Sequence, residues 1–241
     1  MAHQQKGVSI ITCTKRQDYI MNLFKNYHRQ RYPIKELIIV INNDNIQIDL
    51  YKDMAKQYKN VQVYRLAEKK SLGECLNYAV KKSQYSYVAK FDDDDYYAPY
   101  YLTDSIPAFD KSKADIIGKR AHFMYLRGSN MLILRFHLDE NRYVSILPGA
   151  TLIFKRKIFR KVQFADQSIG EDTQFCLDSI AKGYKIYSTD KYNFVAVRRK
   201  NSENHTWVIN DKELLNYVEN IRYPHVLDYK KFVQRSPEDS N

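Results

Sequence analysis

The sequence predicts an α/β protein with a mostly parallel central sheet, helices on both faces of that sheet, and a smaller part of mixed or antiparallel strands. Between residues 8 and 91, apolar runs of strand length alternate with stretches of helical periodicity. Further along the chain, short apolar stretches crowd together, which is typical of hairpins or meanders. The 241 residues contain no internal repeat and no linker rich in Gly, Pro or Ser, so we expect a single domain.

The first half of the chain accounts for the parallel sheet. Expected strands cover residues 8–12, 36–41, 61–64 and 87–91, and the expected helices begin at Asp18 and cover residues 50–58 and 71–80. The last of these helices has the clearest signal, because Ser71 and Glu74 form a capping box ahead of an apolar stripe. Strands that alternate with helices in this way pair in parallel through right-handed crossovers.

The second half of the chain is less regular. We expect a helix over residues 99–109, short strands over 115–117, 122–126, 131–136, 143–147 and 151–154, a helix over 172–182, a strand over 185–187 and a helix over 211–220. Because the short strands follow one another with little room for helices, we expect hairpin-like connections between them.

The composition restricts the class of protein. The 39 Lys and Arg outnumber the 28 Asp and Glu, and a net charge of +11 favours nucleotides, nucleic acid, phosphate-rich polymers or an anionic membrane face, although a solvated surface explains it equally well. Cys13, Cys75 and Cys176 form no CxxC pair, which argues against a disulfide scaffold and a cysteine zinc site and favours a reducing compartment. The apolar run Val8–Cys13 is too short for a signal peptide or a membrane span, so we expect a cytoplasmic protein.

Four consecutive aspartates, Asp92–Asp95, directly follow the strand expected over residues 87–91. Two carboxylates about 6 Å apart repel by about 3 kcal/mol at an effective dielectric constant of about 20, so the run needs a cation or an exposed position. Open parallel sheets bind ligands at the carboxyl ends of their strands, and hard divalent ions prefer carboxylate oxygens. The run therefore predicts a Mg²⁺ or Mn²⁺ site that holds a diphosphate, and the alternative is an acidic loop that caps the next helix.

Five segments, taken in order, resemble motifs of the GT-A glycosyltransferases, specifically the large inverting family 2. These segments are Val8–Arg16, Glu36–Asn43, Ser71–Ala79, Phe91–Asp95 and Gly170–Asp172, and the resemblance extends from Val8 to about Trp207. They are similar to that family's first strand and nucleotide loop, its second strand, its Gly-x-x-x-Asn helix, its DxD signature and its late Glu-Asp motif. Asn42 and Asn43 stand where the family often has two acidic residues, which weakens the assignment of UDP over other nucleotides.

The resemblance implies a GT-A fold in which residues 1–98 bind a nucleotide and residues 99–241 bind an acceptor. It implies metal-dependent, inverting transfer of a sugar from a nucleotide-diphospho-sugar, in first place a UDP-sugar, to a hydroxyl of a carbohydrate or glycoconjugate in cell-surface polymer synthesis. Nucleic acid is not an expected partner, whereas peripheral contact with the inner membrane face suits the charge. One alternative is a catalytically inactive module of the same fold that binds an anionic polymer or membrane. A nucleotidyltransferase is less favoured, since residues 12–16 lack its Gly-rich phosphate loop.

On the same resemblance, Asp172 is the expected general base, and Glu171 is the alternative base or a residue that orients the acceptor. A carboxylate at a helix N-terminus is favoured in its ionised form, ready to accept a proton, although the same field lowers its basicity. An ordinary acidic first turn of the helix is the plain alternative.

The expected metal ligands are Asp94 and His205. The family pattern Asp-x-Asp-Asp maps onto Asp92, Asp94 and Asp95, and a shift by one residue, to Asp93 and Asp95, stays open. His205 is equally explained as a surface or hydrogen-bonded histidine. The arginines at 198–199 precede it and offer forked donors to a diphosphate, or they form a solvated basic edge.

The remaining expected contacts concern the two substrates. Nucleotide-binding residues are expected at Thr12, Thr14, Arg16, Asn43, Lys70, Asp92 and Asp93, and acceptor-binding residues at Gly149 and Trp207. Asn43 offers a donor and an acceptor to a base edge, but turn chemistry explains it as well. Lys70 is equally a solvent-exposed lysine. Gly149 allows close backbone approach, and Trp207 suits either a sugar platform or core packing.

Overall fold

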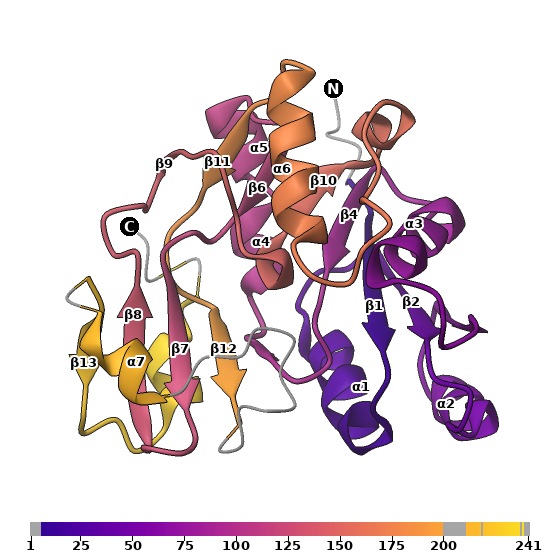
Figure 1. Cartoon of the computed structure of the whole chain (residues 1–241), viewed down its shortest axis with the longest axis horizontal. Coiled ribbons are helices and arrows are strands. Elements are labelled where there is room, and N and C mark those ends of the chain that lie inside the picture. Colours follow the sequence, from indigo (N-terminus) through magenta and orange to yellow (C-terminus); the bar gives the residue numbers. More distant parts are fainter. Residues whose placement is uncertain (1–5, 200–210, 218, 237, 239–241) are drawn as a thin grey trace.

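The computed structural model describes residues 6–199, 211–217, 219–236 and 238, which form two sheets that stand beside each other (Figure 1). The strands are β1 (Val8–Thr14), β2 (Lys35–Ile41), β3 (Val61–Arg65), β4 (Tyr87–Lys90), β5 (Tyr96–Tyr97), β6 (Ile116–Gly118), β7 (His122–Leu126), β8 (Met131–Arg135), β9 (Arg142–Tyr143), β10 (Ile153–Lys155), β11 (Ile186–Ser188), β12 (Phe194–Arg198) and β13 (Ile221–Tyr223). The α-helices are α1 (Ile20–Arg29), α2 (Ile48–Ala55), α3 (Leu72–Lys82), α4 (Tyr101–Ser105), α5 (Ala108–Ser112), α6 (Glu171–Ala181), α7 (Asp211–Asn216) and α8 (Tyr229–Val233). Short 3₁₀ helices are η1 (Gln17–Tyr19), η2 (Gly149–Thr151) and η3 (Arg156–Arg160).

The central sheet has the strand order β3-β2-β1-β4-β10-β6-β11-β9. Strand β1 pairs in parallel with β2 and β4, and β2 pairs in parallel with β3. Strand β10 is antiparallel to both of its neighbours, β4 and β6, and β11 is again parallel to β6. The prediction of a mostly parallel sheet with a mixed part is therefore confirmed.

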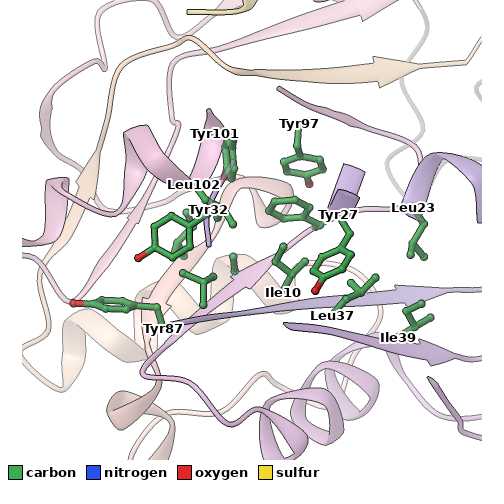
Figure 2. Packing of buried hydrophobic residues seen from close by; sticks show 14 of the residues in the cluster. Ile10, Leu23, Tyr27, Tyr32, Leu37, Ile39, Tyr87, Tyr97, Tyr101 and Leu102 are labelled. Atoms are coloured by element: carbon green, nitrogen blue, oxygen red, sulfur yellow. The ribbon is translucent and has the colours of Figure 1, made fainter. Parts of the chain in front are cut away.

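Helices cover both faces of this sheet, as the sequence predicted, because successive side chains of a buried strand point to opposite sides. In β1, Ile10 packs in a cluster with Leu23 and Tyr27 of α1, while Ile11 packs in a second cluster with Leu76 of α3 and Phe175 of α6. Figure 2 shows the first cluster, in which tyrosine rings supply much of the apolar surface.

The smaller sheet has the order β13-β8-β7-β12-β5 and differs from the sequence prediction in several places. Strands β5, β12 and β13 and helix α8 were not expected. Strand β12 pairs in parallel with β7, which lies about 70 residues earlier, so no local turn pattern announces it. The strand expected over residues 143–147 is wrong beyond Tyr143, and its remainder is a loop that leads to η2.

The helix expected over residues 99–109 is two short helices, α4 and α5, that meet at Pro107. Proline lacks the amide hydrogen that a continuous helix needs at this position. Both halves of the chain contribute strands to both sheets, and the division of ligand binding at residue 98 stays a prediction. Within the described ranges, no helix is both long and apolar enough to cross a bilayer.

Candidate active site

The acidic run lies at the carboxyl edge of the parallel sheet. Strands β1 and β4 are parallel neighbours, so the segment at the end of β1, Thr14–Arg16, and the segment after β4, Asp92–Asp95, come together although they are nearly 80 residues apart. Thr14 Oγ1 donates a hydrogen bond to Asp93 Oδ2 at 2.5 Å. Parallel α/β sheets bind their ligands at this edge.

The four aspartates alternate between inward and outward positions. Asp93 and Asp95 are buried, and Asp95 Oδ1 accepts a hydrogen bond from the amide of Val197 in β12 at 2.8 Å. The side chains of Asp92 and Asp94 remain 38% and 14% exposed. This alternation supports the register in which Asp92 and Asp94 face a ligand, whereas Asp93 is engaged by the protein itself.

Arg16 supplies the cation that the aspartate run requires. Its guanidinium bonds both oxygens of Asp93 and donates through Nη1 to Asp94 Oδ2 at 2.7 Å. Burial raises the pKa of Asp93 to about 6, and the charge of Arg16 opposes this shift. Burial alone would lower the pKa of Arg16, but attraction to Asp93 and Asp94 raises it. Arg16 therefore stays positively charged beside the two carboxylates. Arg16 was expected to contact the nucleotide, and its contacts in the structure are with these carboxylates.

Lys90 is a site residue that the sequence reasoning missed. It is 4% exposed at the end of β4, and its Nζ donates to Asp92 Oδ1 at 2.5 Å. Burial lowers the pKa of Lys90, but Asp92, Glu171 and Asp172 together raise it above its ordinary value, so the lysine stays protonated. A lone lysine within the apolar run 87–91 was the available signal, since a buried lysine is nearly always paired.

Glu171 and Asp172 form the first turn of α6. Asp172 Oδ2 accepts a hydrogen bond from the amide of Gly149 at 2.7 Å, and Oδ1 accepts one from the amide of Thr173 at 2.7 Å. A Cβ atom on Gly149 would lie 2.7 Å from Asp172 Oδ2, so the glycine makes room for this carboxylate. The close approach predicted at Gly149 is thus an approach of Asp172.

Glu171 is only 5% exposed. Burial raises the pKa of its carboxyl group to about 7; Lys90 opposes the shift, and the negative charges of Asp172 and Asp92 add to it. These electrostatic couplings connect the first turn of α6 with the end of β4. The carboxyl group of Glu171 therefore changes its protonation state near neutral pH.

The segment that delivers α6 is fastened to α3. The amide of Gly73 donates to Gln167 O at 3.0 Å, and a Cβ on Gly73 would lie 1.8 Å from Ala165 O. The side chain of Asn77 bonds both the amide and the carbonyl of Phe164, at 2.9 and 2.8 Å. The capping box of Ser71 and Glu74 is confirmed. The Gly-x-x-x-Asn pattern therefore positions the loop before Asp172.

Three of the expected nucleotide-binding residues are buried or have partners within the protein, and their contact with a nucleotide stays a prediction. Thr12 is buried within β1. The amide group of Asn43 donates to Lys15 O at 3.1 Å, and its oxygen accepts from the amide of Asn45 at 2.8 Å, so the turn accounts for it. Lys70 is exposed and pairs with Glu74 at 2.5 Å. His205 and Trp207 lie outside the described residues.

The donor chemistry at Asp94 suits a divalent ion, because carboxylate oxygens are the ligands that Mg²⁺ and Mn²⁺ prefer. Among the residues that the structure describes, no three His, Cys, Asp or Glu side chains converge into a metal site. The residues present therefore fit an ion that takes a minority of its ligands from this part of the chain. Phosphate oxygens and water supply the remainder in sites of this type.

Comparisons with known proteins identify the family and the fold of this chain. The glycosyl transferase family 2 model matches residues 9–170. The O-antigen biosynthesis glycosyltransferase WbnJ of Escherichia coli is 29% identical over 168 residues, which cover 64% of this chain and 63% of WbnJ. The chain thus spans less than two thirds of the length of this relative.

Solved structures of glycosyltransferases share the fold. TarS of S. aureus, residues 1–349 in complex with UDP-GlcNAc, superposes with a TM-score of 0.65 at 20% identity over 84% of this chain and 62% of that one. The mannosyltransferase PcManGT from Pyrobaculum calidifontis, in complex with GDP-Man and Mn²⁺, gives 0.64 at 16% identity over 84% and 59%. The predicted GT-A fold is confirmed, and the extent of the family match shows that the chain belongs to glycosyl transferase family 2.

Proposed function

We propose that this protein is an inverting glycosyltransferase that moves a sugar from a nucleotide-diphospho-sugar, in first place a UDP-sugar, to an acceptor hydroxyl. The observation that carries the proposal is the gathering of Asp92, Lys90, Glu171 and Asp172 at the carboxyl edge of the sheet, beside the Asp94–Arg16 pair. Family membership and the UDP-GlcNAc complex of TarS support a nucleotide-sugar donor.

The donor half of the site is the edge formed by β1 and β4. Asp92 and Asp94 face outward there, and Lys90 and Arg16 hold them in place against their mutual repulsion. A divalent ion bound at Asp94 would neutralise charge on the departing diphosphate. The Mn²⁺ complex of PcManGT supports divalent metal use.

Asp172 is the proposed general base. Inverting transfer requires a carboxylate that removes the acceptor proton as the hydroxyl attacks. Hydrogen bonds from the amides of Gly149 and Thr173 fix the position of the Asp172 carboxylate. Glu171 is buried behind it and acts as a positioning residue through its coupling to Lys90. Because the carboxylates needed for both donor binding and proton removal are present, an enzyme is favoured over the inactive binding module.

The relatives support a role in polysaccharide synthesis, as WbnJ acts in O-antigen biosynthesis. A cytoplasmic location and peripheral contact with an anionic membrane stay predictions. The complex of TarS with UDP-GlcNAc favours UDP as the nucleotide of the donor, and the complex of PcManGT with GDP-Man makes GDP the alternative.

The test compares Asp172→Asn with Asp178→Asn on the same helix, a half-buried position whose carboxylate bonds only to Gln174 within the described chain. A thermal-shift screen of UDP, GDP and their sugars, with and without Mn²⁺, first identifies the donor. We then expect Asp172→Asn to bind the nucleotide normally and to lose about 10²- to 10⁴-fold in turnover. Near-normal turnover by this variant contradicts the assignment of the base, and absence of nucleotide binding by the wild type contradicts the proposed function.

A further inference from the structure

A polar pocket lies at the same edge of the central sheet as the candidate active site. It has a volume of about 240 Å³ and is lined by Arg120, Asp139 and residues 142–146. Strands β4 and β6 run in the same direction, because each is antiparallel to β10, which lies between them. Arg120 follows β6 by two residues, as Asp92 follows β4, so both leave the sheet at one edge. Two strand spacings, about 10 Å, separate β4 from β6.

The pocket is connected directly to the proposed base. Strand β9 and residues 144–146, which line the pocket, continue into Pro148 and Gly149, whose amide donates to Asp172. The amide of Arg120 donates to Ser188 Oγ at 2.9 Å, which anchors this arginine at the end of β11. The pocket therefore lies beyond Asp172 on the side opposite to β1, where Arg16 marks the donor half.

The charge of the pocket is positive. Arg120 and Arg142 share one carboxylate, that of Asp139, at 3.8 and 3.7 Å. Both separations exceed hydrogen-bonding distance, so the two guanidinium groups retain N–H donors for another acceptor. Arg120 is held flat by Phe136, whose ring centroid lies 3.7 Å from the guanidinium carbon.

The surroundings increase this positive potential. Burial and then the charge of Arg120 lower the pKa of Arg135 to about 10. Burial, Arg135 and Arg120 also lower the pKa of His122, whose ring is therefore neutral, so the positive charge here comes from the arginines alone. An anion in the pocket relieves this repulsion.

We propose that the pocket binds an oxyanion of the acceptor, a phosphate or carboxylate group carried on the sugar or polyol chain whose hydroxyl is glycosylated. The inference rests on the proposed function and defines its acceptor class. Forked guanidinium donors match the planar geometry of a carboxylate and two oxygens of a phosphate. An acidic group bound here would place a hydroxyl of the neighbouring part of the acceptor next to Asp172.

The test uses small probes of both anion types with neutral partners: sn-glycerol 3-phosphate against glycerol, and glucuronate against glucose. Binding is measured by calorimetry on the wild type and on Arg120→Gln, Arg142→Gln and Arg156→Gln. Arg156 is an exposed arginine that bonds Gln84 O near the start of β4, at the opposite edge of the sheet. Arg142 is 59% exposed, so its replacement leaves the fold intact even if Arg120→Gln does not fold.

We expect at least one anionic probe to bind and its neutral partner not to bind. Loss of either pocket arginine weakens that binding about tenfold or more, as a charge-assisted hydrogen bond is lost, while Arg156→Gln leaves it unchanged. UDP binding is unaffected by all three substitutions, and UDP does not displace the anion. Equal binding by all variants, displacement by UDP, or no binding of either anion overturns the proposal. An anion bound as expected by a protein that binds no nucleotide or nucleotide-sugar refutes the proposed function instead.

Discussion

Replacing Gly149 with alanine tests how finely the structure positions Asp172. The new Cβ would lie 2.7 Å from Asp172 Oδ2 and 3.0 Å from its Cβ, whereas ordinary contacts begin at 3.4 Å, so the carboxylate must retreat by 3.4 − 2.7 = 0.7 Å. A misplacement of about 1 Å in a reacting group costs about 10²-fold in rate. We therefore expect Gly149→Ala to reduce turnover by about 10- to 100-fold while nucleotide affinity stays unchanged.

The assay follows UDP release from the donor found in the thermal-shift screen, with affinity measured separately by calorimetry. The matched control is Gly7→Ala, whose Cβ would crowd the Tyr85 ring at 2.3 Å at the opposite edge of the sheet. This control is expected to lower the unfolding temperature and to leave turnover per folded molecule intact. If Gly149→Ala keeps turnover within about twofold of the wild type, the position of Asp172 does not limit the reaction.

Three further predictions concern the charges of the site. Asp94→Asn is expected to abolish the Mn²⁺-stimulated part of nucleotide binding in calorimetric titrations, and unchanged stimulation would place the ion elsewhere. Arg16→Lys keeps one charge but loses the fork between Asp93 and Asp94, so urea denaturation should show a loss of about 1–2 kcal/mol, and no loss would contradict the pairing. The folded-state pKa of Glu171, about 7, lies above its ordinary value of 4.5, so the folded state binds more protons between these values and loses stability as pH rises through them. Glu171→Gln removes this loss, at most about 3 kcal/mol, and should gain stability relative to the wild type from pH 4.5 to 7.5; parallel curves for the two proteins would refute the shift.

The sequence was sufficient for features that depend on neighbours along the chain. The periodicity of the first half predicts β1 to β4 and their helices, and the spacing of Ser71 and Glu74 predicts the start of α3. The aspartate run was found in the same way, because the end of a strand is a local signal, whereas Asp172 was singled out through the resemblance to family 2 motifs.

Contacts between distant segments were not predictable from one sequence. Nothing near Arg16 indicates that its partners are Asp93 and Asp94, and nothing near Asp95 indicates the amide of Val197 in β12. Strand β12 itself was missed, and its last residue, Arg198, for which contact with a diphosphate and a solvated edge were both open, is buried in the structure. In each case tertiary pairing decides the role of a side chain that local pattern leaves open.

The loop before α6 is attached to α3, and this attachment makes the Gly-x-x-x-Asn motif and the Glu-Asp motif depend on each other. Gly73 and Asn77 belong to the helix that follows β3, yet they hold backbone atoms of residues 164–167, only a few positions ahead of Asp172. Consider a chimera that takes residues 164–172 from another family member but keeps the α3 of this chain. The contacts of Gly73 and Asn77 would then not fit the new segment, and Asp172 would be displaced. When both segments are exchanged together, these contacts should be kept. Attempts to transfer acceptor preference between relatives should therefore replace α3 and residues 164–172 together.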